Sequence, residues 1–348
     1  MAVETEKFNV KKFVENLQKV ASTVRCDDTQ EFFRKMELPA FYNEDKFKRG
    51  QKFFHDHIFA MFYAKLLGLI SDLAFPDGQA ILRFTKQSSE PETAFRRYVS
   101  TIFHMCTWYN SDLKPGSKLW ESLVKVRNYH NIASKTCKSK GVGQITQYQM
   151  ILAQFGFMGY ALSRPKVIGL HKIVDQDLEG FVHLWRVIGH LLGIEERFNI
   201  CRDSLSETKA ICDEITTQVV RPLVLKWDPS FLNMTGALTS GLWCMVPIIN
   251  RNVCLQYIYQ MVRNEDIDKL DYLEVVKLNY FEIFLYYIVK VCMYTLQFDT
   301  IRVIQKYNMY FILYCTEKCP FLAYYRFKKT NFCVYQRYSE QKINNYLS

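Results

Sequence analysis

Three residues in the middle of the chain could together hold an anionic, metal-bearing ligand. Arg127 and His130 stand three positions apart, and Ser134 follows the histidine by four. Residues three and four apart are neighbours on one helix face, so this stretch would present a cation, an imidazole and a hydroxyl together. Arg97 and Thr101 are also four apart and repeat the cation-and-hydroxyl pair upstream. The two stretches on two helices would suit such a ligand.

Helices should position both stretches. Residues 88–92, Ser-Ser-Glu-Pro-Glu, have the serines, early proline and acids typical of a helix start, which predicts a helix to about residue 109. Ser117 should cap a second helix that runs to about residue 135 and carries His130. Further helices should begin at Thr146 and Asp177 after short turns. This succession is typical of a helical bundle.

The composition also indicates an all-α protein. The chain has 348 residues, 49% of them hydrophobic, so it can bury a sizeable core. Its 14 glycines and 9 prolines are few, and apolar residues recur at helical spacing. We expect an N-terminal helical extension over residues 1–45, one helical domain over 46–265, and C-terminal helices with a basic tail over 266–348 packed on that domain. Residues 41–50 should be a linking loop, and Pro76-Asp77-Gly78 a turn.

Charge and cysteine usage limit the partners and the compartment. The net charge of +10 is spread along the chain, and no zinc-finger, RNA-recognition or helix-turn-helix signature is present, so no nucleic-acid partner is expected. The 11 cysteines form no CxxC pair, and the first residues have no apolar signal region, which predicts a reduced, cytosol-facing protein. A charge at a bilayer centre costs about 3 kcal/mol, so Lys290 favours a buried or membrane-surface helix over residues 280–298.

Other histidines offer weaker alternatives. Glu179 and His183 are four apart and His190 follows seven later, which is the geometry of a non-haem iron site if carboxylates from elsewhere join them. His104 lies seven residues after Arg97 and therefore shares its helix face. A lone histidine on an amphipathic helix is also commonly structural. No GxSxG, HExxH or dinucleotide motif supports a hydrolase or a nicotinamide enzyme.

Four groups of residues, taken in order, resemble a known family. They are Arg97-x-x-Ser100-Thr101, Arg127-x-x-His130, the stretch from Gln147 to Phe157, and the stretch from Asp177 to Ile194. Their order and separations resemble the catalytic domain shared by the ER-bound oxygenase mpaB and rubber oxygenase, the latex-clearing protein. The resemblance covers roughly residues 50–200 and is strongest to animal members of the family.

The resemblance implies a globin-like helical core that binds haem b. His130 matches the proximal iron ligand, and Arg97, Thr101 and Arg127 match residues that would hold haem propionates or order the pocket. The distal lysine of rubber oxygenase falls on Ser100. The candidate catalytic residues are Ser100, from this match, and His104, from its place on the same helix face as Arg97.

The function implied is a haem-dependent oxygenase that uses O₂ on an apolar, isoprenoid or lipid-like substrate. The second family arginine falls on Ser134, and a family glutamate has no clear counterpart. These departures motivate an alternative, a non-catalytic haem or lipid carrier that kept the fold. A third reading is a membrane-peripheral interaction protein that uses residues 280–298 and the basic tail, with the ER membrane as one location.

Overall fold

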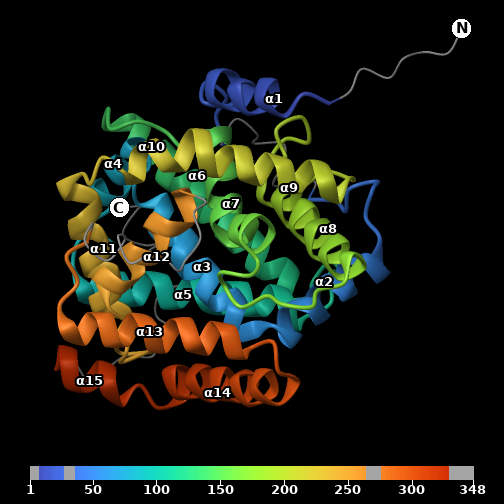
Figure 1. Cartoon of the computed structure of the whole chain (residues 1–348). Coiled ribbons are helices and arrows are strands. Elements are labelled where there is room, and N and C mark those ends of the chain that lie inside the picture. The colour runs from blue at the N-terminus through green and yellow to red at the C-terminus, as the bar shows by residue number, and fades with distance from the viewer. Residues whose placement is uncertain (1–7, 27–35, 264–275, 329–348) are drawn as a thin grey trace, which may run out of the picture.

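The computed structural model of the chain is built from helices and confirms the predicted all-α class (Figure 1). It describes residues 8–26, 36–263 and 276–328. Within these ranges there is no β-strand, and extended backbone pairs only at an isolated antiparallel bridge between Arg25 and Thr146.

The four predicted central helices form close to their expected bounds. They are α5 (Pro91–Asn110), α6 (Lys118–Ser139), α7 (Gln147–Ser163) and α8 (Asp175–Leu192). Ser117 caps α6, because its side chain accepts a hydrogen bond from the Trp120 amide. Thr146 and Gln149 form a reciprocal capping box on α7. These local signals therefore set the starts of the helices that carry the candidate site.

Two segments predicted as breaks are helices, so those predictions were wrong. Most of 41–50 belongs to α2 (Glu44–Asp56), which Asn43 caps by accepting from the Lys46 amide. Pro76 opens α4 (Pro76–Phe84), where its missing N–H would have no helical partner in any case. The charged residues that suggested a loop lie on the solvent side of α2, while the other side is buried and consists of Phe47, Gly50, Phe53 and Phe54.

Helix α3 (Ile58–Asp72) crosses α7 backbone to backbone. Its Gly68 faces Gly156 of α7, and a β-carbon at Gly68 would lie 2.0 Å from the Gly156 carbonyl oxygen. A similar contact joins α2 and α8 through Gly50 and Gly180. Glycine is required at such crossings because any side chain would separate the helices.

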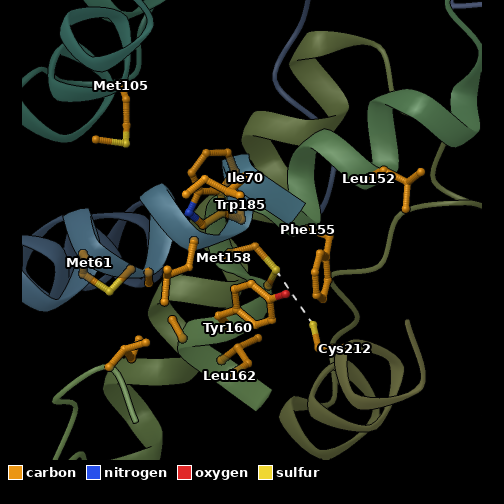
Figure 2. Close-up of a cluster of buried hydrophobic side chains, with 14 of the residues drawn as sticks. Met61, Ile70, Met105, Leu152, Phe155, Met158, Tyr160, Leu162, Trp185 and Cys212 are labelled. Carbon is orange, nitrogen blue, oxygen red and sulfur yellow. Dashed lines mark hydrogen bonds between the residues drawn. The ribbon is translucent and has the colours of Figure 1, made fainter. Parts of the chain in front are cut away.

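A buried apolar cluster fills the space around these crossings (Figure 2). The largest of its fully buried side chains is Trp185 of α8, whose indole nitrogen donates to the Tyr109 hydroxyl at 2.9 Å. The Tyr160 hydroxyl lies 2.6 Å from the hydroxyl of Ser71. The Trp185 indole and the Tyr109 and Tyr160 hydroxyls thus have partners, as buried polar groups require.

The remaining helices surround this core. They are α1 (Val10–Asn16) with a π-helical turn Leu17–Ala21, α9 (Leu205–Glu214) with a π-helical turn Ile215–Val220, α10 (Arg221–Val224), α11 (Pro229–Leu242), α12 (Arg251–Arg263), α13 (Tyr280–Thr295), α14 (Asp299–Lys318) and α15 (Phe321–Phe327). Figure 1 shows α13 and α14 side by side along one edge, and the Gln305 amide of α14 lies 3.9 Å from the Cys292 sulfur of α13.

Among the described residues, no individual helix has both the length and the apolar character to cross a bilayer. Two helix pairs satisfy these criteria only when taken together across a sharp bend. They are α2 with α3, bent by 92°, and α13 with α14, bent by 117°.

Candidate functional site

A cavity of about 1110 Å³ lies within the helical core. This is slightly larger than the roughly 300–1,000 Å³ of common small-molecule sites. Its wall is mainly aliphatic and aromatic and is formed chiefly by α3, α5, α6, α7, α8, α12, α13 and α14. Five residues singled out in the sequence line it together: Arg97, Ser100, Thr101, His104 and His130.

His130 has the properties of a ligand-ready imidazole. Its Nδ1 is buried and has no hydrogen-bond partner within the described residues. Burial, assisted by the nearby positive charges of Arg97 and Arg127, lowers the pKa of His130 from 6.5 to about 4. The ring is therefore neutral at physiological pH, which is the form that binds metals.

Arg97 brings a positive charge to the same wall one helix away. Its guanidinium lies 5.8 Å from the centre of the Tyr98 ring and influences Asp72, whose pKa burial raises to about 6 against the lowering effect of Arg97. Thr101 donates its hydroxyl hydrogen to the Arg97 carbonyl at 3.0 Å, a bond within its own helix. Arg97 is thus the lining group best suited to a ligand carboxylate.

Arg127 and Ser134 do not lie in the cavity wall as described. Arg127 is 2% exposed and donates to the Leu191 carbonyl at 2.9 Å, at the C-terminal end of α8. Its guanidinium packs against Gly193, which has a φ of +103° and would bring a β-carbon to within 2.9 Å of it. Ser134 accepts from the Ile145 amide at 3.0 Å. Both residues join α6 to neighbouring backbone segments.

His104 is held in place by the Ser122 hydroxyl, which also binds the Trp108 indole. Its Nδ1 lies 2.7 Å from the Ser122 hydroxyl, which accepts from the Trp108 indole nitrogen at 2.9 Å. Burial lowers the pKa of His104 to about 4. His104 is therefore a second neutral imidazole along this cavity.

Lys65 is the lining residue that the sequence argument missed. It lies on α3 and is 6% exposed, and its Nζ is buried without a hydrogen-bond partner among the described residues. The ammonium nitrogen lies 3.7 Å from the centre of the Phe157 ring. The available signal was a single charge inside a long apolar run.

The alternative iron site at Glu179, His183 and His190 is not formed. His183 Nε2 accepts from the Asn43 amide at 3.0 Å, and Glu179 is exposed. Across the described ranges, no three histidine, cysteine or carboxylate side chains gather in a metal-binding arrangement. The single imidazole of His130 would therefore suit a metal that brings most of its other ligands with it.

A comparison with protein families matches residues 52–243 to the family described as the ER-bound oxygenase mpaB/B'/rubber oxygenase catalytic domain. The match spans more than half of the chain. The chain belongs to this family. The mpaB/rubber oxygenase region runs from α2 to the end of α11 and includes every candidate site residue.

The mpaB/rubber oxygenase family also appears among solved structures. A structure of latex clearing protein in the closed state is 14% identical to this chain, covers 84% of each chain, and superposes with a TM-score of 0.45. A comparison with curated proteins found no match. Membership of the family implies oxygenase activity.

Proposed function

We propose that the protein is a haem b-dependent oxygenase of the mpaB/rubber oxygenase family, with His130 as the protein ligand to iron. The observation that carries the proposal is the Nδ1 of His130, which is buried, lacks a partner in the described structure and belongs to a residue of the cavity wall. A neutral imidazole in a large apolar cavity is the ligand that a haem site needs. Haem bound there would supply redox chemistry towards O₂.

The chain's own residues would bind and orient the reactants. Arg97 would pair with a haem propionate, because a guanidinium matches a carboxylate in two parallel hydrogen bonds. Thr101 donates its hydroxyl hydrogen to the Arg97 carbonyl, so its oxygen can still accept a hydrogen bond from a bound molecule. Ser100 and His104 remain the candidates for groups that touch the reacting atoms, because both line the cavity.

The composition of the cavity wall supports an apolar substrate. Phe59, Phe62, Leu66, Leu69 and Phe157 are examples of the hydrocarbon surface that the cavity presents. Such a surface favours an apolar molecule, since burying it releases roughly 25 cal/mol per Å² of apolar area. An isoprenoid or lipid-like substrate fits this wall, and the same wall would exclude water from the reaction.

An absorption spectrum of the purified protein tests the proposal. The protein, as isolated or after addition of haemin, should show a Soret band. His130→Ala should remove the band, whereas His183→Ala, on a histidine bound to the Asn43 amide, should keep it. A protein that stays colourless after haemin addition would overturn the haem assignment.

A non-catalytic haem or lipid carrier is the second candidate. It is supported by Ser100, where the family's rubber oxygenase has a lysine, and by Ser134, which is used to bind the Ile145 amide. Oxygen uptake distinguishes the two functions. An oxygenase should consume O₂ in the presence of an apolar polyene, whereas a carrier should show only a spectral change.

We also propose that the protein works at an anionic membrane surface. Helices α13, α14 and α15 expose large apolar side chains, among them Phe281, Phe284, Val291 and Tyr307. Residues 280–328 carry six basic and three acidic side chains, so this edge complements acidic lipids. Phe284 and Val291 also line the cavity, which would place its mouth at the lipid surface.

Flotation with liposomes tests membrane binding. The protein should float with vesicles that contain phosphatidylserine, and serine at positions 281, 284 and 291 should abolish this. Val174→Ser changes an equally exposed apolar residue outside α13–α15 and should have no effect. Equal flotation of both variants would contradict the proposal.

A further inference from the structure

Lys65 is placed where a lysine is costly. Lysine is almost never fully buried unless it is paired. Lys65 is 6% exposed, and no described donor or acceptor reaches its Nζ. The acid nearest to it among the cavity-lining residues of α3 is Asp72, seven residues and about 10 Å farther along the helix axis. Lys65 thus lines the cavity with a buried amine that contacts no counter-ion in the described part of the chain.

This environment makes the amine a nucleophile. Burial lowers the pKa of Lys65 from 10.5 to about 7, against an opposing effect from Cys106. A large fraction is therefore uncharged near pH 7.5, whereas an exposed lysine is almost wholly protonated. Uncharged buried lysines form Schiff bases with carbonyl compounds.

We propose that Lys65 is a covalent capture site for apolar aldehydes and ketones that enter the cavity. The amine lone pair attacks the carbonyl carbon and gives a carbinolamine. Loss of one water then forms the C=N bond, and hydrolysis reverses the step. No electrons are transferred, so the reaction needs neither oxidant nor reductant, and it does not depend on the proposed oxygenase function.

The surroundings of Nζ favour this product. The Phe157 ring centre lies 3.7 Å away and would stabilise a protonated imine through its π face. The adjacent wall, which includes Leu66, Leu69 and Ile102, would hold the hydrocarbon part of the ligand. Selectivity should therefore rise with the length of the apolar chain, and small water-soluble aldehydes should gain little.

Reductive trapping tests the proposal on the full-length purified protein. The protein is incubated at pH 7.5 with decanal and cyanoborohydride, and the modified lysines are located by peptide mass spectrometry. Lys65 should be alkylated at least about ten-fold faster than the exposed Lys48, because its uncharged fraction is far larger. Excess decanol, which fills the cavity but forms no imine, should suppress this adduct and spare those on exposed lysines.

Two variants complete the test. Lys65→Met should eliminate the cavity adduct and leave surface labelling unchanged. Phe157→Leu keeps the lysine and should lower the adduct yield several-fold. The proposal is overturned if decanal labels Lys65 no faster than Lys48 in the wild-type protein, or if decanol fails to protect it. A protein that binds no haem but still captures decanal would refute the proposed function and leave this site intact.

Discussion

Gly68 of α3 and Gly156 of α7 face each other, but only Gly68 lacks room for a β-carbon. A β-carbon on Gly68 would lie 2.0 Å from the Gly156 carbonyl oxygen, whereas one on Gly156 would lie 3.4 Å from the Gly68 carbonyl oxygen. The first distance requires the two backbones to move apart, and the second is near ordinary contact. This crossing fixes the position of Lys65, one turn before Gly68.

Alanine at these two positions should therefore have unequal effects. Gly68→Ala should destabilise the fold by about 3 kcal/mol or more, because overpacking against backbone cannot be relieved by a rotamer change. Gly156→Ala should be nearly neutral in stability. The gain of up to about 1 kcal/mol in helix propensity should offset the mild crowding of the new β-carbon against Gly68. Thermal midpoints measured by circular dichroism would show this. Equal midpoints for the two variants would mean that the helices are not in this contact.

Lys65→Met should stabilise the protein at pH 7. The folded-state pKa of about 7 lies below the ordinary 10.5, so the unfolded chain binds more protons between these values. Stability from this group is present at high pH and is lost as the pH falls towards 7. The gain in the variant should be on the order of 2–4 kcal/mol at pH 7 and should shrink towards pH 10.

The control for this measurement is Lys48→Met. Lys48 forms an exposed ion pair with Glu44 at 2.6 Å, and exposed pairs of this kind add little to stability. Its replacement should give no stabilisation at pH 7. If the stabilities of the two variants had the same pH dependence, Lys65 would not be a buried amine with a lowered pKa.

Substitutions of Arg127 and Arg97 should distinguish a residue that stabilises the fold from one that binds the ligand. Arg127→Met removes a buried charged donor from the Leu191 carbonyl and should cost about 2 kcal/mol of stability. Arg97→Met should leave the thermal midpoint close to that of the wild type and weaken haemin binding. Haemin titrations followed at the Soret band, together with melting curves, give both readouts. Weaker haemin binding in Arg127→Met at unchanged stability would assign Arg127 to the pocket instead.

Acid should unfold the protein through its buried histidines. Burial lowers the pKa values of His57, His104 and His183 from 6.5 to about 4. The unfolded chain therefore takes up protons below pH 6.5 before the folded chain does, and the free energy of unfolding falls between pH 6.5 and 4. Each histidine contributes a slope of at most about 1.4 kcal/mol per pH unit.

His104→Asn isolates one of these contributions. The asparagine amide can replace Nδ1 as a partner for Ser122 but does not titrate in this range. The melting temperature of the His104→Asn variant should depend less on pH between 6.5 and 4 than that of the wild type. An unchanged slope would show that His104 is not buried in a neutral form.

The sequence by itself determined that the fold is helical and where the central helices begin. Ser117 and Thr146 act within one turn of their own helices, so their effect is readable from neighbouring residues. Helical spacing likewise placed Arg97 with Thr101 and suggested that His130 faces a ligand. The α2 segment failed because many charged side chains on an exposed face resemble a loop when the buried face is not recognised.

Tertiary structure decided which side chains share the cavity. Arg127 and His130 lie three residues apart on α6. Arg127 nevertheless donates to a carbonyl at the C-terminal end of α8, whereas His130 lines the cavity. Lys65 joins His130 there from α3, because the glycine crossing brings α3 against α7. Helical spacing states which residues share a face, but the packing of helices distant in the chain determines what that face meets.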